Sequence, residues 1–182
     1  MKKTILAAAL VVVPFVSGQA LAMTDDMDMF GGVTLGSSSV YLGGDLSADD
    51  STSSFGLKLG SNFDDFRAYG DLSIASWSDA SLTAITGNAD YLYTVTEKLD
   101  IFAGGHLGFH SFDVDGWDSS GGLGYGFQVG GIYDFSKLVS RDGMTAELGM
   151  RYSLSGAEAE VSTYTLEVDN LTNFYVGVNY AF

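Results

Sequence analysis

The sequence ends in Asn173-Phe174-Tyr175-Val176-Gly177-Val178-Asn179-Tyr180-Ala181-Phe182. Apolar or aromatic residues occupy its even-numbered positions, and mostly polar or small residues occupy its odd-numbered positions. Because successive side chains of a β-strand point to opposite faces, this alternation predicts a strand with one apolar and one polar face. Strands of a soluble β-sandwich and of a membrane barrel would both alternate in this way, so the rest of the sequence has to distinguish them.

Residues 1–22 have the organisation of a secretory signal peptide. Lys2 and Lys3 precede an unbroken apolar run from Ile5 to Val13, and Ala20-Leu21-Ala22 supplies a small-x-small cleavage pattern. The apolar run is much shorter than the roughly 20 residues that a membrane-spanning helix requires. We therefore expect export and cleavage after Ala22, which leaves residues 23–182 as a single domain.

Composition restricts what this domain can do. Loss of Lys2 and Lys3 leaves six basic residues against 23 acidic ones, a formal charge of −17, which excludes binding to nucleic acid or to an anionic membrane surface through bulk electrostatics. The absence of cysteine excludes disulfides and a lipid-modified N-terminal cysteine. The only proline is Pro14, so every later strand can have two hydrogen-bonded neighbours.

Eight segments with strand-like alternation follow one another along the mature chain. We expect strands at about 33–42, 54–62, 66–75, 82–94, 99–109, 123–135, 144–154 and 173–182. Residues 23–29 are expected to form an acidic lead-in without strand structure. Residues 155–172 lead into the last strand, and within them Glu160 to Val168 are expected to extend the last hairpin rather than add a ninth strand. Connections after the odd-numbered strands are acidic or long and the others mostly shorter, although the turn 136–143 is unusually long. This pattern predicts an all-β fold, an eight-stranded antiparallel up-and-down transmembrane barrel.

Two properties of the strand faces favour the membrane barrel over the sandwich. The polar faces are rich in glycine, serine and asparagine, which fits the narrow interior of an eight-stranded barrel that side chains just fill. Outward-facing aromatic residues gather at one end of the predicted strands, as in an interfacial girdle. These residues are Phe66, Tyr91, Tyr93, Tyr133, Phe135, Tyr180 and Phe182.

Charged residues within the strands fall on the polar faces, which would line the lumen. Unpaired charges there would cost several kcal/mol each, so we expect them to pair with one another and fill the barrel. The sequence leaves open whether they form a sealed plug or border a narrow water path. The predicted network consists of Lys58, Arg67, Asp71, Asp90, Glu147 and Arg151.

The signal peptide, the strand spacing and the terminal Tyr180-Ala181-Phe182 resemble those of the small outer-membrane barrels of the OmpA-like and OmpX/Ail-like kind. The resemblance covers the mature chain but is a pattern rather than a catalytic motif. It implies location in the outer membrane, contact with lipid and lipopolysaccharide, and delivery by periplasmic chaperones. It also implies recognition of the last strand by the barrel-assembly machinery, through Phe174, Val176, Val178, Tyr180 and Phe182.

Two groups of residues suggest chemistry, and for both the plainer interpretation is favoured. His106 and His110 would lie about 13 Å apart along one strand, and Ser111 would point away from His110, so they form neither a shared metal site nor a nucleophile–base pair. Lumenal hydrogen bonding is the preferred role of the histidines. The stretch Asp113 to Asp118 lacks the spacing of an EF-hand loop, which favours a solvated acidic loop over a cation site.

The sequence therefore predicts a monomeric, non-enzymatic outer-membrane barrel with a structural or surface-interaction role and no cofactor or metal. Its outward connections are short and acidic, with Asp45, Asp49, Asp50, Asp113, Asp115, Asp118, Glu158, Glu160 and Glu167. Two alternatives remain, a narrow small-solute channel and a lipid A-modifying enzyme.

Overall fold

The structure, a computed structural model, describes residues 27–44, 48–116, 118–119, 121–161 and 164–182. The predicted signal peptide and Asp45 lie outside these ranges, and the side chains of Asp49, Asp118, Glu158 and Glu160 are likewise not described. The elements in chain order are β1 (Met27–Gly44), β2 (Ala48–Phe63), β3 (Phe66–Ser76), β4 (Ala80–Thr96), β5 (Leu99–Val114), β6 (Asp118–Ser119), β7 (Gly121–Asp134), α2 (Ser136–Val139), β8 (Met144–Ser155), β9 (Glu158–Val161) and β10 (Tyr164–Ala181). Within the described ranges, no helix has the length and apolarity needed to cross a membrane.

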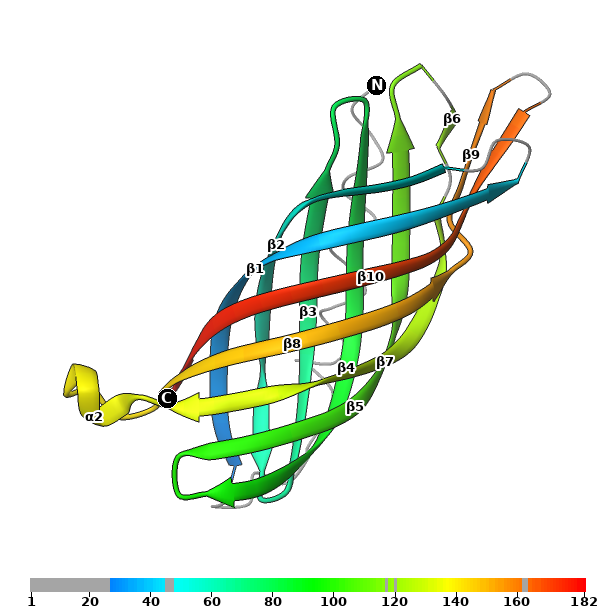
Figure 1. Cartoon of the computed structure of the whole chain (residues 1–182). Coiled ribbons are helices and arrows are strands. Elements are labelled where there is room, and N and C mark those ends of the chain that lie inside the picture. Colours follow the sequence, from blue (N-terminus) through cyan, green and yellow to red (C-terminus); the bar gives the residue numbers. More distant parts are fainter. Residues whose placement is uncertain (1–26, 45–47, 117, 120, 162–163) are drawn as a thin grey trace.

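Eight long antiparallel strands close into a barrel, as the sequence predicted (Figure 1). Each of β1, β2, β3, β4, β5, β7, β8 and β10 pairs with the next strand in this order. Pairing of β1 with β10, from Phe30 opposite Ala181 to Gly44 opposite Leu166, closes the cylinder. Closure gives the long strands partners on both sides over most of their length, which is the only arrangement in which a sheet can span lipid.

The two ends of the barrel differ. At one end, here called the α2 end, lie the turns 64–65 and 97–98, helix α2 and the end of β10. At the opposite β9 end, β9 pairs with β10 and β6 pairs with β9, so two short strands widen the sheet beyond the barrel wall. Residues 158–161 therefore extend the last hairpin, as predicted, and do not form a ninth strand of the barrel.

Several strands are longer than predicted, and the prediction for residues 27–29 was wrong. Met27 to Met29 belong to β1, because their backbone pairs with β2 from Met27 opposite Phe63. At the β9 end, β5 continues to Val114 and β10 begins at Tyr164, so much of what the sequence indicated as loop is paired strand. Ladder hydrogen bonds between neighbouring backbones continue past the apolar stretches that defined the prediction.

The barrel has an apolar exterior and a polar interior, the reverse of a soluble protein. Large outward side chains are widely exposed, for example Leu107 (60%), Leu148 (64%) and Val176 (55%), whereas Arg67 and Asp90 are almost fully buried in the lumen. Of the predicted girdle, Phe66, Tyr91, Tyr93, Tyr133, Tyr180 and Phe182 are exposed at the α2 end, and Phe135 is half-buried. An apolar surface of this extent requires an apolar environment.

Glycines on the inner face make room for the largest inward side chains. Phe102 and His106 on β5 lie opposite Gly130 and Gly126 on β7. A Cβ atom at Gly130 would lie 2.5 Å from Phe102 Cζ and closer still to the carbonyl oxygen of Leu148. Glycine on the polar faces is therefore a packing requirement, since each missing side chain leaves space for a ring on the neighbouring strand.

We predict that Gly130→Ala destabilises the barrel by roughly 1–3 kcal/mol, because Phe102 and the backbone of β8 must both move to admit the methyl group. The free energy of unfolding is measured by urea titration of the purified, membrane-reconstituted protein. The matched control is Gly87→Ala, where the added Cβ would have only Leu107 O at 3.8 Å. Equal urea midpoints for the two variants would contradict this account of the glycines.

Candidate functional site

The lumen is the candidate site, and a buried carboxylate, Glu147 on β8, is the centre of its charged network. Lys58 Nζ donates to Glu147 Oε1 at 2.8 Å, and Arg67 donates to both carboxylate oxygens at 2.9 and 3.0 Å. Tyr175 Oη at 2.8 Å and Asn179 Nδ2 at 3.1 Å also donate to it. Four residues from β2, β3 and β10 thus converge on one carboxylate, which compensates the loss of its hydration.

Arg67 connects Glu147 to a second carboxylate. Its Nε lies 2.7 Å from Asp90 Oδ2, so the guanidinium spans two acids on two different strands. Gln128, fully buried on β7, donates through Nε2 to Asp90 Oδ1 at 2.6 Å and to Tyr69 Oη at 2.7 Å. The planar guanidinium suits this role because it presents its donors in a fixed fork.

Arg151 forms the other half of the network. Its Nη1 lies 2.9 Å from Asp71 Oδ1, its Nε donates to Gln128 Oε1 at 3.0 Å, and its Nη2 donates to Asn88 Oδ1 at 3.2 Å. Gln128 therefore accepts from one half of the network and donates to the other. Three cations and three carboxylates are joined into one lumenal layer without net formal charge.

Aromatic rings cover two of the three cations of this layer. Lys58 Nζ lies 4.4 Å from the centre of the Tyr175 ring, and the Arg67 guanidinium carbon lies 4.4 Å from the centre of the Phe102 ring. These contacts stabilise desolvated cations on faces that hydrogen bonds leave free. The layer is thus packed with rings as well as ion pairs.

The structure brings all six sequence-predicted charged residues together. Their detailed partners depend on three-dimensional neighbours, and Arg151 pairs with Asp71 rather than with Glu147. Sequence reasoning did not include the neutral members of the layer, although each lies on an inward-facing strand position. Alternation could have identified them as lumenal, but not as partners of a charge; they are Tyr69, Asn88, Gln128, Tyr175 and Asn179.

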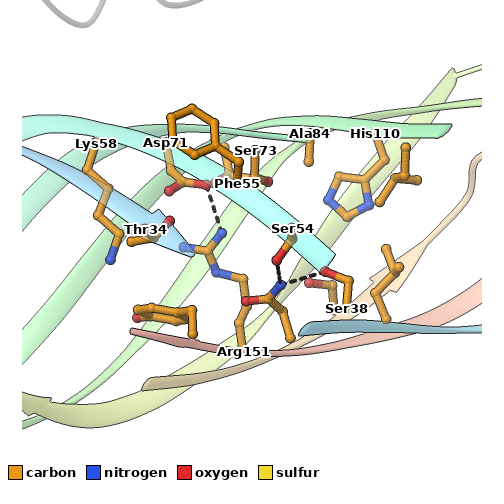
Figure 2. Close-up of a pocket in the computed structure, with 16 residues that line it drawn as sticks. Thr34, Ser38, Ser54, Phe55, Lys58, Asp71, Ser73, Ala84, His110 and Arg151 are labelled. Atoms are coloured by element: carbon orange, nitrogen blue, oxygen red, sulfur yellow. Dashed lines mark hydrogen bonds and ion pairs between the residues drawn. The ribbon is translucent and has the colours of Figure 1, made fainter. Parts of the chain in front are cut away.

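Beside the charged layer, toward the β9 end, the lumen contains a small cavity of about 50 Å³ (Figure 2). Its lining includes charged residues of the network, among them Asp71 and Arg151, as well as apolar residues such as Phe55. It also includes six residues that carry a hydroxyl group, which are Thr34, Ser38, Ser54, Ser73, Thr86 and Ser153. Asn173 Nδ2 donates across it to Ser38 Oγ at 2.5 Å and to Ser54 Oγ at 2.7 Å. A cavity of this size and polarity can hold a few water molecules.

A buried apolar cluster borders this cavity. Leu82 and Leu171 border both the cavity and the cluster, so the two are in direct contact. The lumen is therefore stratified into a charged layer, a hydroxyl-lined cavity and an apolar cap. The buried members of the cap are Val40, Leu82, Phe112, Ala157, Val168 and Leu171.

Both histidines face the lumen, as predicted, and Ser111 is exposed on the other face, so His110 and Ser111 form no pair. The structure adds a contact that the sequence did not suggest: His106 Nε2 lies 2.8 Å from Ser153 Oγ. Strand β7 lies between β5 and β8. In its ladders, His106 of β5 is opposite Gly126, and Gly126 is opposite Ser153 of β8. Only knowledge of this register could have found the pair.

The His106–Ser153 pair lacks two features of a hydrolytic site. His106 Nδ1 is buried without a hydrogen-bond partner in the described part of the chain, so no third group orients the ring. Both side chains are also buried inside the lumen, away from the lipid-facing surface. This geometry favours a packing role for the His106–Ser153 pair over a hydrolytic one.

The acidic stretch 113–118 is only partly described. Asp113 lies in β5 and is exposed, as is Asp115, whereas residue 117 and the side chain of Asp118 lie outside the described residues. Among the side chains that the structure describes, no group of three histidine, cysteine or acidic residues could hold a metal ion.

The outward face of β10 and the residue that follows it carry the five residues that the resemblance connects with barrel assembly. All five side chains are exposed along the barrel wall. The backbone N–H of Phe182 donates to Met29 O at 2.8 Å, which fixes the end of β10 against β1. The five are Phe174, Val176, Val178, Tyr180 and Phe182.

Several solved protein structures have the same fold as this chain. The chain is similar to Neisserial surface protein A (TM-score 0.64, 20% identity), covering 84% of this chain and 97% of that one. It is also similar to outer membrane protein H of P. aeruginosa (TM-score 0.57, 25% identity, 85% and 99% covered) and to Ail, the attachment invasion locus protein of Yersinia pestis (TM-score 0.50, 13% identity, 84% and 98% covered). Searches of protein-family models and of curated proteins give no match. The predicted resemblance is confirmed: the chain has the fold of the small eight-stranded outer-membrane barrels.

We predict that Glu147→Gln destabilises the barrel by roughly 3–5 kcal/mol, because it leaves Lys58 and Arg67 with one carboxylate fewer in a buried layer. The free energy of unfolding is measured by urea titration of the reconstituted protein. Asp115→Asn, which changes an exposed carboxylate at the β9 end, should shift it by no more than about 0.5 kcal/mol. If Glu147→Gln unfolds at the same urea concentration as Asp115→Asn, the network does not stabilise the barrel.

Proposed function

We propose that the protein is an integral outer-membrane barrel that acts in the structure or surface interactions of the cell envelope rather than in catalysis. The observation that carries the proposal is the inverted distribution of polarity around a closed sheet, with apolar side chains outside and a neutral ion network inside. The similar solved structures, which include a surface protein and an attachment protein by name, support the same class of function.

A sealed lumen is part of the proposal. The charged layer, the hydroxyl-lined cavity and the apolar cap follow one another along the lumen. The charged layer has no net formal charge that would attract ions. Function would then reside at the β9 end, where the described side chains of Asp113, Asp115 and Glu167 are exposed. With no basic residue among the residues of that end, it would favour cationic partners over anionic ones.

The route to the membrane follows from the sequence. We propose that residues 1–22 direct export and that residues 23–182 form the barrel domain, delivered by periplasmic chaperones. The apolar row ending in Tyr180 and Phe182 would be recognised by the barrel-assembly machinery. The mature protein would be a monomer in contact with outer-membrane lipid and lipopolysaccharide.

The first test is fractionation combined with gel mobility. We predict that the expressed protein is recovered in the outer-membrane fraction and migrates differently before and after boiling, because a closed barrel resists unfolding by detergent at room temperature. Deletion of Phe182 should lower the amount of the heat-modifiable form, whereas Glu97→Gln in an exposed turn should not. Recovery in the soluble periplasm, without a change in mobility on boiling, would refute the proposal.

A narrow small-solute channel is the second candidate, and two observations favour it. The hydroxyl-lined cavity occupies part of the lumen, and His110, which lines it in Figure 2, has a buried Nδ1 without a partner in the described residues. A continuous water path would require an opening through the charged layer beside Arg151 and another through the apolar cap.

Planar-bilayer recording distinguishes a sealed lumen from a channel. We predict that the wild-type protein gives no discrete openings, because the charged layer and the apolar cap both block the lumen. The comparison is Arg151→Ser, which removes the side chain between Asp71, Asn88 and Gln128. Discrete wild-type openings whose size changes in Arg151→Ser would establish the channel and overturn the sealed lumen.

A further inference from the structure

The connection between β7 and β8 is the longest at the α2 end. The other two turns there consist of residues 64–65 and 97–98, whereas residues 135–143 separate β7 from β8 and include α2. Short turns are the rule at the inner end of such barrels. A closed barrel does not need so long a connection here. We call residues 135–143 the excursion, and its structure indicates an additional role.

The connection has a defined shape. Ser136 Oγ accepts from Met144 N–H at 3.0 Å and donates to Met144 O at 3.2 Å, while Ser136 N–H donates to Asp134 Oδ1 at 2.8 Å. Arg141 N–H donates back to Ser136 O at 3.2 Å, and Ser140 adopts a left-handed conformation with φ 53°. Buried Ser136 thus fixes both ends of the excursion, and a non-glycine residue tolerates an uncommon backbone conformation to complete it.

This shape presents apolar side chains away from the protein. Figure 1 shows α2 standing away from the barrel wall. Leu138 is 77% exposed, more than any other large hydrophobic side chain in the described residues, and Val139 is 49% exposed. In water, holding leucine and valine side chains exposed would be unfavourable, because no burial of apolar surface compensates it.

Basic residues flank this apolar tip. Lys137 precedes it and Arg141 follows it, and the Arg141 guanidinium carbon lies 4.8 Å from the centre of the Tyr180 ring in the aromatic girdle. The carbonyl of Lys98 accepts from Asp134 N–H at 2.8 Å, which places the adjacent turn beside the base of the excursion. Of the basic residues after Lys3, these three are exposed, and the other three lie in the lumenal layer.

We infer that residues 136–141 form an interfacial anchor, in which Leu138 and Val139 enter the boundary of the acyl chains while Lys137 and Arg141 contact phospholipid phosphates of the inner leaflet. The inference rests on the proposed membrane location. Apolar side chains beside lysine and arginine, continuous with a girdle aromatic, are the combination that settles at a membrane interface. Exposed carboxylates lie at the same end, among them Glu97, Asp134 and Asp142, so the contact would depend on individual phosphates rather than on bulk attraction to an anionic surface.

Spin-label depth measurement tests the anchor. The chain has no cysteine, so single-cysteine variants need no background substitution. The protein is reconstituted into phospholipid vesicles with a nitroxide at Leu138→Cys, and accessibility to lipid-soluble oxygen is compared with accessibility to a water-soluble nickel chelate. Leu148→Cys on the exposed barrel wall marks the bilayer interior, and Glu97→Cys in an exposed turn marks water.

The anchor predicts that oxygen accessibility exceeds nickel accessibility at Leu138, at a depth shallower than that of Leu148. Adding Lys137→Glu and Arg141→Glu should shift the Leu138 label toward water without changing the Leu148 label. A Leu138 label as open to nickel as the Glu97 label would overturn the anchor while leaving the barrel proposal intact. A label shielded from both reagents would also overturn it, by indicating a second copy as the occupant, whereas a water-exposed Leu148 label would refute the membrane location itself.

Discussion

Pairing of β1 with β10 is the constraint on which the rest of the structure depends. In lipid, no water satisfies a free backbone N–H or C=O group, so a sheet that spans a bilayer must have no open edge. The ladder from Phe30 opposite Ala181 to Gly44 opposite Leu166 satisfies this requirement. Closure also creates an interior narrow enough that eight strands of side chains fill it, and every inward residue must therefore fit a neighbour across the lumen.

That narrow interior explains the chemistry of the lumen. Charged residues at inward positions are removed from water, and each is stable only when its partners replace the lost hydration. Glu147 receives four donor residues, Arg67 spans two carboxylates, and Gln128 joins the two halves of the layer. Glycines such as Gly130 complete the packing by leaving space for inward rings. The same inward residues thus fill the lumen and provide the ion pairs that compensate its buried charges.

The two ends of the barrel present different surfaces. The α2 end combines girdle aromatics and the apolar tip at Leu138 with exposed residues of both charges, and it carries all the exposed basic residues of the described chain, Lys98, Lys137 and Arg141. The β9 end has exposed carboxylates and widens through β6 and β9. If the protein lies in the outer membrane as proposed, this asymmetry would place the apolar tip at the inner leaflet and the widened β9 end at the exterior.

Local sequence determined which way each side chain points, because strand alternation has a period of two and needs no knowledge of neighbours. The alternation in residues 173–182 indicated an apolar exterior, and the inward placement of Lys58, Arg67 and Glu147 followed from the same rule. Only the tertiary structure decided the partners, since these depend on register across a closed sheet, where a small shift exchanges every contact. The pairing of Arg151 with Asp71, the His106–Ser153 contact and the strand character of residues 27–29 are of this kind. The exposed position of Leu138 likewise came from hydrogen bonds between Ser136 and Met144, which no periodicity in the sequence records.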